Sequence, residues 1–337
     1  MKENIAISVI IPVYNVKDYI KDCLDSVVAQ RFPNKEVIIV DDGSTDGSGE
    51  ICDAYSAKYA NFRVIHKTNS GPSPSRNVGI NEAHGQWLIF LDSDDVWSDP
   101  CCLQKLYSYA TKLNLDVVRF EVQTVNERLE YVEPYSYDKS NITGRVIDNY
   151  ELVKYGISGK WFTVLFLLRK DIIKNLRFNE LINSQEDIDF YSRLFASREL
   201  RCGYIDERMY LYRKRTASIT TTARISNLEG SFSLCDVFYN ESTKIKDKRL
   251  KHLYVYYSVM MYYWTLQTIA TDAYYPKRKE IIDKLEIKNL RKNTLIREKQ
   301  TSIPNKYLPF LYLSPIASIW LTRTKYKLIH ILKLMRK

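Results

Sequence analysis

The feature that most constrains the fold is a regular alternation, in the first hundred residues, of short apolar segments with amphipathic ones. Residues 7–13 (Ile-Ser-Val-Ile-Ile-Pro-Val) and 36–40 are typical of buried strands, and residues 18–30 between them carry apolar side chains at helical spacing. Further strands are expected at residues 62–66 and 87–91. Strands that are apolar on both faces and alternate with helices predict an α/β fold, with a mostly parallel sheet flanked by helices.

Polar clusters follow three of these strands: Tyr14-Asn15, Asp41-Asp42 and Asp92-Ser93-Asp94-Asp95. Ligands of open parallel sheets bind beyond the carboxyl ends of the strands. The three carboxylates of the last cluster repel one another unless a cation lies among them. Hard oxygen ligands of this kind suit Mg²⁺ or Mn²⁺. Either acidic cluster taken alone is also compatible with a solvated turn, so the argument depends on the repeated position at strand ends.

Three later segments are candidates for ligand binding or catalysis. The loop Asn69–Asn77 can offer backbone amides to a phosphate, and Arg76 adds a fork of donors. Glu186 and Asp187 begin a predicted helix, where one could act as a general base or both could simply favour the helix dipole. The segment Arg213–Thr220 can clamp a diphosphate or form a solvated loop. No Walker loop and no dinucleotide-binding fingerprint is present.

Together, these segments resemble the family 2 glycosyltransferases, whose nucleotide-sugar transferase fold is called GT-A and is Rossmann-like. The resemblance covers roughly residues 5–222. It implies a GT-A domain at residues 1–225, with a nucleotide-sugar-binding half at 1–100 and an acceptor-binding half at 101–225. A helical C-terminal region is expected at residues 226–337.

The resemblance also implies a role for individual residues. Asp187 would be the catalytic base, with Glu186 beside it. Asp94, together with Asp95, would hold Mn²⁺ or Mg²⁺. The positions implied in binding the nucleotide sugar are Pro12, Tyr14, Asn15, Asp41, Asp42, Arg76, Asp92, Ser93, Arg213 and Ser218.

The expected activity is an inverting, metal-dependent transfer of a sugar from a nucleotide diphosphate sugar, with UDP as the expected nucleotide. The expected acceptor is a hydroxyl of a lipid-linked glycan in the synthesis of a bacterial cell-surface polysaccharide such as a capsule. The Q-x-x-R-W motif of the family's long-chain synthases is absent, which favours single additions. The alternatives are a nucleotidyltransferase, a glycosidase, or a glycan- or membrane-binding module without catalysis.

The charge of the chain is placed unevenly. The net charge is +10, but residues 276–337 hold 16 Lys and Arg against 4 Asp and Glu, so the first 275 residues hold 34 against 36. Residues 308–337 contain six Lys and Arg, no acidic residue and interleaved aliphatic side chains. This predicts a basic amphipathic segment on an anionic membrane surface, with packing on its own domain or a homo-oligomer contact as alternatives. The basic residues of this segment alternate with aliphatic side chains and not with aromatic ones that could stack on bases, so nucleic acid is not expected as a partner.

The expected location is the cytoplasmic side of the cell membrane, with peripheral attachment. No secretory signal is visible, and the apolar stretch Leu308–Leu321 is interrupted by proline and shorter than the roughly 20 residues that a spanning helix needs. The six cysteines show no metal-binding or disulfide spacing, which favours a reducing compartment.

Overall fold

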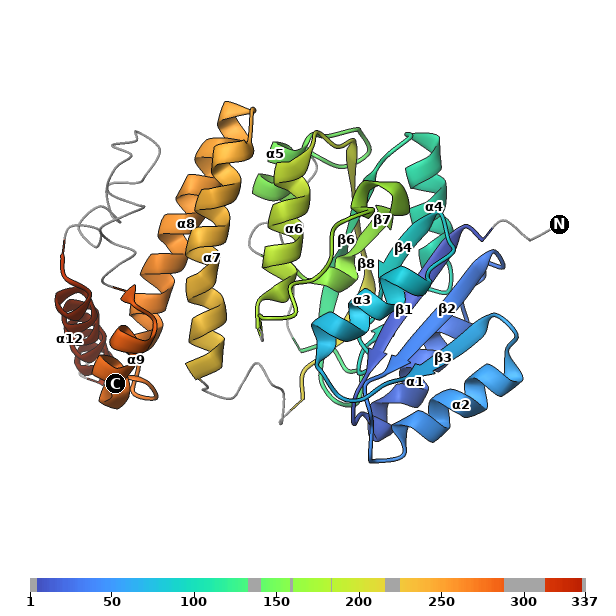
Figure 1. Cartoon of the computed structure of the whole chain (residues 1–337), viewed down its shortest axis with the longest axis horizontal. Helices are drawn as coiled ribbons and strands as arrows, with labels where there is room; N and C mark the ends of the chain where they lie inside the picture. The colour runs from blue at the N-terminus through green and yellow to red at the C-terminus, as the bar shows by residue number, and fades with distance from the viewer. Residues whose placement is uncertain are drawn as a thin grey trace. The chain divides into compact units, whose positions relative to one another are not determined.

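The computed structural model describes residues 5–132, 141–157, 160–182, 184–215, 225–287 and 313–334. The chain forms two compact units (Figure 1). The first comprises Met1–Leu181 and Arg198–Ser218, and the second comprises Ile182–Ser197 and Ile219–Lys337. The first contains the whole sheet and the second is helical, which confirms the predicted α/β class with a C-terminal helical region.

The sheet has eight strands in the order β3-β2-β1-β4-β7-β6-β8-β5. The first four are mutually parallel, whereas β7 is antiparallel to both β4 and β6, β8 is parallel to β6, and β5 is antiparallel to β8. The carboxyl ends of β1, β2 and β4 therefore lie at one edge. The strands are β1 Ile7–Val13, β2 Lys35–Asp41, β3 Phe62–His66, β4 Trp87–Phe90, β5 Val96–Trp97, β6 Val117–Val125, β7 Phe166–Arg169 and β8 Cys202–Arg213.

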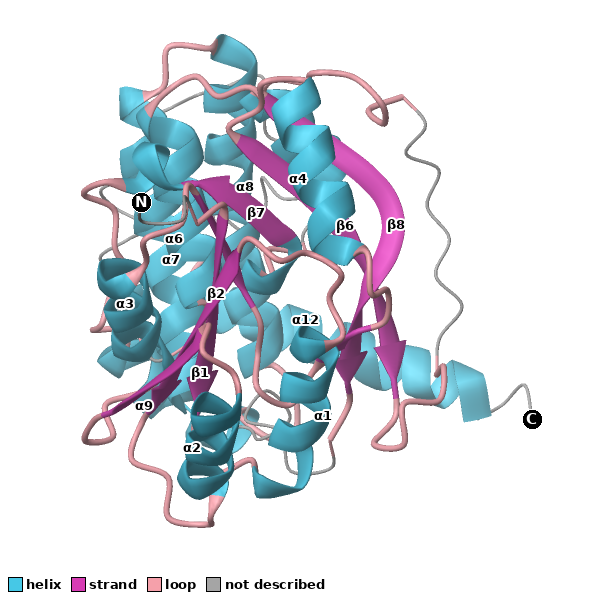
Figure 2. Cartoon of the chain, turned by 90° about the vertical axis from the view of Figure 1, so that its right-hand side faces the viewer, coloured by secondary structure: helices cyan, strands magenta, loops and turns pink. Residues whose placement is uncertain are grey.

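Helices cover both faces of the parallel part of the sheet (Figure 2). The helices α1 (Lys17–Val28), α2 (Ser48–Lys58) and α4 (Cys102–Lys112) share one hydrophobic core with the odd-numbered residues of β1. On the opposite face lies α3 (Pro72–Glu82), whose Gly79 packs directly on Ile10 of β1. This alternation buries every side chain of β1 except that of Pro12, as a strand covered on both faces requires.

The second unit consists of helices around its own core. Its members are α6 Glu186–Ser197, α7 Ile225–Lys244, α8 Lys248–Ile269, α9 Arg278–Lys284 and α12 Pro315–Leu334. Tyr254 of α8 donates a hydrogen bond of 2.8 Å to the carbonyl of Ser192 in α6. Because α6 packs with α7 and α8, the second unit begins before the single boundary that was predicted at residue 225. Within the described part of the chain, no helix combines the length and the apolar character needed to cross a bilayer.

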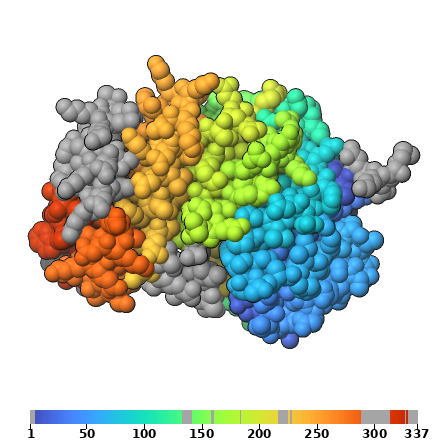
Figure 3. Space-filling model, in the orientation of Figure 1, coloured from blue at the N-terminus to red at the C-terminus, as the bar shows by residue number. Residues whose placement is uncertain are grey.

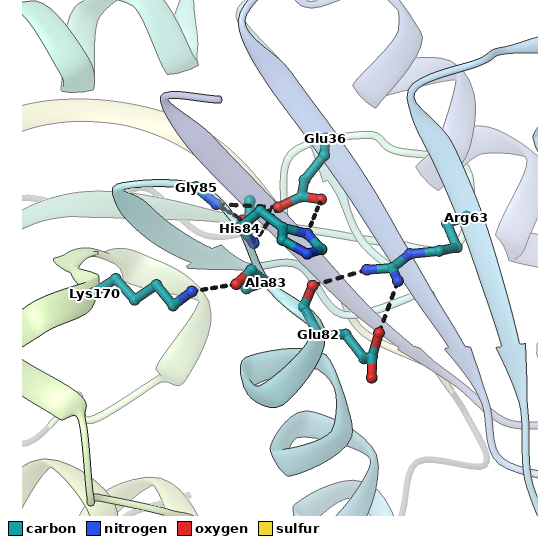
Figure 4. Close-up of polar contacts among 8 residues, drawn as sticks. Glu36, Arg63, Glu82, Ala83, His84, Gly85 and Lys170 are labelled. Carbon is teal, nitrogen blue, oxygen red and sulfur yellow. Dashed lines mark hydrogen bonds and ion pairs between the residues drawn. The ribbon is translucent and has the colours of Figure 1, made fainter. Parts of the chain in front are cut away.

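Glu36 ties the amino-terminal edge of the sheet together (Figure 4). Its carboxylate accepts hydrogen bonds from the Ser8 hydroxyl at 2.6 Å and from the backbone N–H groups of His84 and Gly85 at 2.6 and 3.1 Å. A Cβ atom at Gly85 would lie 2.5 Å from the Ser8 nitrogen, so only glycine fits there. The figure also shows Arg63 bonded to Glu82 and Lys170 bonded to the Ala83 carbonyl.

Glu36→Gln is expected to lower the free energy of unfolding by about 1–3 kcal/mol at pH 7, because the neutral amide oxygen accepts the three bonds now made to Oε1 less strongly than a charged carboxylate oxygen does. Urea denaturation measures the change. Burial alone would raise the pKa of Glu36, but the bonds from Ser8 and His84 outweigh it and lower the pKa. Glu36 therefore makes its full contribution to stability above the pKa of the unfolded chain, about 4.3, and that contribution fades as the pH falls below this value. Glu199→Gln, on an exposed side chain, is the matched control, and equal effects would refute the assignment.

Candidate active site

Asp95 joins the end of β4 to the end of β8. Its carboxylate is 1% exposed and accepts hydrogen bonds from the Tyr210 hydroxyl at 2.6 Å and from the Arg213 backbone N–H at 2.7 Å. Its own N–H closes a turn onto the Asp92 carbonyl at 3.0 Å. Both carboxylate oxygens of Asp95 are thus used to hold the chain, which makes this residue the support of the acidic cluster.

Asp94 pairs with a cation from the chain itself. The Arg215 guanidinium lies 2.7 Å from its carboxylate. Burial raises the pKa of Asp94, the nearby Asp92 adds to the rise, and Arg215 offsets only part of it. Burial, followed by Asp94 and Asp92, likewise raises the pKa of Asp95 well above its ordinary value. The cluster therefore favours the approach of a further positive charge.

Arg76 connects α3 to the same cluster. Its Nη2 atom lies 3.1 Å from Asp92 Oδ1, and its guanidinium lies 5.4 Å from the centre of the Phe178 ring. Ser93 is buried, whereas the Asp92 side chain is 34% exposed, against 21% for Asp94. Asp92 is thus the carboxylate of the cluster most accessible from outside.

Tyr19 of α1 lies close to two arginines at the carboxyl end of β8, Arg213 in the strand and Arg215 just after it. The guanidinium carbons of Arg213 and Arg215 lie 5.0 and 5.2 Å from the centre of its ring. Arg213 also bonds to Asp22, one turn further along α1, at 2.9 Å. Within the described residues, the buried Nε atom of each arginine has no hydrogen-bond acceptor. Two adjacent cations, of which Arg215 has the more exposed side chain at 24%, form a site that favours negative charge.

The ends of β1 and β2 meet beside this region. Tyr14 follows β1 and its side chain is 48% exposed, while Pro12 is partly buried within the strand. The Asn15 side chain accepts the Thr45 N–H at 2.9 Å, and the Asn15 N–H donates to the Ser44 hydroxyl at 3.1 Å. Asn15 therefore anchors the loop after β2 to the end of β1, and Tyr14 remains open to a ligand.

Asp41 and Asp42 bind their own chain. Asp42 accepts the backbone N–H groups of Ser70 and Gly71 at 3.0 and 2.7 Å, which fixes the loop before α3. Asp41 pairs with His66 at 2.8 Å. Both aspartates are less than 5% exposed. The turn-stabilising role is thus observed, and a contact of Asp42 with a nucleotide base stays a prediction.

The predicted catalytic pair belongs to the second unit. Glu186 and Asp187 occupy the first turn of α6, as the sequence predicts, and their chemical role stays a prediction. The neighbouring Asp189 is buried and bonded to Arg193 at 3.0 Å, so it has a structural role. Ser218 lies outside the described residues.

The structure brings together predicted residues that are far apart in the sequence, and it adds others. Arg76, Asp92, Asp94, Asp95 and Arg213 gather around the carboxyl ends of β4 and β8. Tyr19, Asp22 and Tyr210 were not predicted as site residues, whereas Arg215 lies in the segment Arg213–Thr220 that was predicted to clamp a diphosphate. Tyr19 and Asp22 share a helix face through their i, i+3 spacing, but this spacing does not reveal that the face meets β8.

Comparison with known proteins decides the family. The model of glycosyl transferase family 2 matches residues 8–172. The glycosyltransferase EpsJ of Bacillus subtilis strain 168 is 34% identical over 244 residues, which are 69% of this chain and 70% of EpsJ. The chain belongs to glycosyltransferase family 2. It is therefore an enzyme of the glycosyltransferase class, and the other classes considered from the sequence give way to this one.

Two further comparisons bear on the fold and on the relatives of this family 2 glycosyltransferase. S. aureus TarS (residues 1–349), solved with UDP, superposes with a TM-score of 0.73 at 20% identity over 96% of this chain and 91% of that one, which confirms the predicted GT-A fold. TarS with UDP-GlcNAc gives 0.70. A poly(ribitol-phosphate) β-glucosyltransferase of Bacillus spizizenii is 40% identical over 126 residues, which are 36% of this chain but 20% of that protein.

Tyr19→Leu is expected to weaken binding of inorganic pyrophosphate about tenfold, because it removes two cation–π contacts of about 0.5–1 kcal/mol each. Tyr19→Phe keeps the ring and is expected to bind as the wild type does. Isothermal titration calorimetry measures both affinities. Tyr59→Leu, which removes a ring beside Lys58 on α2, is the matched control. If Phe and Leu at position 19 had the same effect, the ring would not position the arginines.

Proposed function

We propose that this enzyme transfers a sugar from a UDP-sugar to a hydroxyl of a glycan acceptor, with inversion at the anomeric carbon and with help from Mn²⁺ or Mg²⁺. The observation that carries the proposal is the pair of arginines around Tyr19, next to the Asp92–Asp95 cluster at the carboxyl edge of the sheet. The TarS structures with UDP and UDP-GlcNAc support the choice of nucleotide.

The arginine pair supplies the recognition of the diphosphate. Arg213 is held by Asp22 and Arg215 by Asp94, so both guanidiniums are in place before a ligand arrives. The Arg215 side chain is 24% exposed and open to phosphate oxygens, whereas the Arg213 side chain is only 2% exposed. Donors that are oriented in advance stabilise the charge that develops on the leaving group without a cost of reorganisation.

The residues present fit a metal ion shared with the donor. Within the described residues, no three His, Cys, Asp or Glu side chains gather as ligands of a complete protein site. Mg²⁺ and related ions commonly use one or two carboxylates and take their other ligands from phosphates and water. Asp94, assisted by Asp92, supplies such carboxylates, whereas both oxygens of Asp95 are already bonded. The ion, when bound, offsets negative charge on the departing diphosphate.

The chemical step is a single displacement. The acceptor hydroxyl forms a bond to the anomeric carbon while the bond from that carbon to the diphosphate oxygen breaks, and the electron pair leaves with the diphosphate. Asp187 accepts the proton of the hydroxyl, and a positioned base of this kind contributes a factor of about 10²–10⁴ in rate. Arg213 and Arg215 hold the diphosphate during departure. One displacement inverts the configuration.

The acceptor belongs to the synthesis of a cell-surface polysaccharide and is carried on a lipid at the cytoplasmic side of the membrane. The poly(ribitol-phosphate) β-glucosyltransferase among the relatives supports a polymeric acceptor. The basic C-terminal region supports a location at an anionic surface.

A panel of nucleotide sugars with and without MnCl₂ tests the donor and the metal together. A saturating UDP-sugar with Mn²⁺ is expected to raise the melting temperature by about 5 °C, and GDP-sugars or NAD are expected to leave it unchanged. Asp94→Asn is expected to lose the part of the shift that depends on Mn²⁺. Asp18→Asn, on an exposed side chain of α1, is the matched control. Undiminished stimulation by Mn²⁺ in Asp94→Asn would place the metal elsewhere.

Asp187→Asn is expected to lower the rate of transfer by about 10²–10⁴ while donor affinity stays within about twofold, because the amide cannot accept the acceptor proton. Single-turnover kinetics with a labelled donor and calorimetry measure the two quantities. Glu186→Gln, one position earlier on α6, is the comparison variant and is expected to keep most of the rate. A collapse in Glu186→Gln alone would move the base to that residue.

A further inference from the structure

The outer face of α12 is formed by large apolar side chains. Ile316, Trp320, Leu321 and Leu328 are 48, 57, 44 and 56% exposed. Ile316, Trp320 and Leu328 are separated by four and eight residues, so they form one stripe along the helix. The C-terminal helix, red in Figure 3, reaches the surface on the side shown. A row of exposed apolar side chains of this length differs from the single exposed residues that are normal on protein surfaces.

The inner face of the same helix is more polar than the outer one. Ser318 and Thr322 are buried, and within the described residues their hydroxyl oxygens have no hydrogen-bond partner. Ile319 is also buried, and it belongs to the core of the second unit. A surface helix in water turns its apolar stripe inward and its hydroxyls outward. Among the described side chains of α12, at residues 315–325, 327 and 328, the orientation is the reverse.

Specific contacts hold α12 in this orientation. Arg323 donates a hydrogen bond to the Ala270 carbonyl at 3.1 Å and pairs with Asp272 at 2.8 Å. Its guanidinium also lies 4.1 Å from the centre of the Tyr275 ring. Together with the burial of Ile319, these contacts prevent the helix from rotating its apolar stripe into the unit.

The positive charges around the outer face favour an anionic binding partner. Lys325 and Lys327 are exposed on α12, and residues 308–337 contain six Lys and Arg without a single acidic residue. Tryptophan and lysine side chains next to aliphatic ones are typical of helices that lie at the interface of a bilayer. The cations attract anionic lipid headgroups, while the apolar stripe enters the acyl boundary.

We propose that the outer face of α12, formed by Ile316, Trp320, Leu321 and Leu328, docks on an anionic lipid bilayer. The helix lies in the plane of the interface and does not span it. Only the role of this binding rests on the proposed function: it would bring the enzyme to a lipid-linked acceptor. Membrane binding itself needs neither donor nor acceptor.

Flotation of the full chain with vesicles tests the proposal. The protein is expected to float with vesicles that contain phosphatidylglycerol at low salt and to remain at the bottom with phosphatidylcholine alone. The double variant Trp320→Ser, Leu321→Ser is expected to lower the partition coefficient at least about tenfold. Leu181→Ser removes a side chain that is 91% exposed in the first unit and is expected to leave it unchanged. Lys325→Glu with Lys327→Glu is expected to weaken binding to anionic vesicles by about fivefold or more for each charge.

Two further measurements decide between a lipid surface and other partners. Brominated lipids are expected to quench the tryptophan fluorescence of the wild type, and Trp320→Phe is expected to lose most of that quenching. A wild type that stays at the bottom with anionic vesicles at low salt overturns the proposal. So does a change from dimer to monomer in Trp320→Ser, Leu321→Ser without any vesicle binding, because the face would then cover a second copy. The rise in melting temperature caused by the donor is measured on the same variants, and it tests the active site independently of membrane binding.

Discussion

The buried carboxylate of Asp95 is the interaction on which the rest of the site depends. It accepts one hydrogen bond from Tyr210 and one from the Arg213 backbone, both in β8, while the cluster that contains it follows β4. These two strands are not neighbours in the sheet, because β7 and β6 lie between them. The link adds to the pairing of β5 with β8, which begins one residue after Asp95, and the two together fix the acidic turn against the basic segment after β8. A buried carboxylate in such a place is tolerated because both its oxygens are bonded.

The link gives the site its paired charges. Once Arg213 is held at Asp95 through its backbone, its side chain reaches Asp22 and Tyr19, and Arg215 reaches Asp94. Each guanidinium thus has a carboxylate partner and a shared aromatic ring. These contacts offset the repulsion between the two cations and keep both close to the sheet edge. In the reaction proposed above, a diphosphate meets an arrangement that is already formed, which is the condition for stabilising charge in the transition state.

Much of this arrangement could be predicted from local sequence patterns, and some could not. The strands β1, β2 and β4 and the polar residues after them were predictable, because buried parallel strands are continuously apolar and end at a common edge. β7 was not, since a strand of four residues, three of them apolar, gives too short a signal. Tyr19 was placed on a helix, but its neighbours come from a strand almost 200 residues later. The packing of α6 with α7 and α8 likewise joins residues that are far apart in the sequence, and no local sequence pattern predicts it.

Burial sorts the acidic residues at the sheet edge into two classes. Asp41, Asp42 and Asp95 have side chains that are nearly inaccessible, and each accepts hydrogen bonds from its own chain. Asp92 and Asp94 keep 34 and 21% of their side-chain surface exposed, and each pairs with an arginine. A carboxylate with two satisfied oxygens has little to offer a ligand, whereas one held by an arginine can exchange that partner for another cation. The adjacent Asp94 and Asp95 look equivalent in the sequence, and their different burial separates a more accessible carboxylate from one that supports the chain.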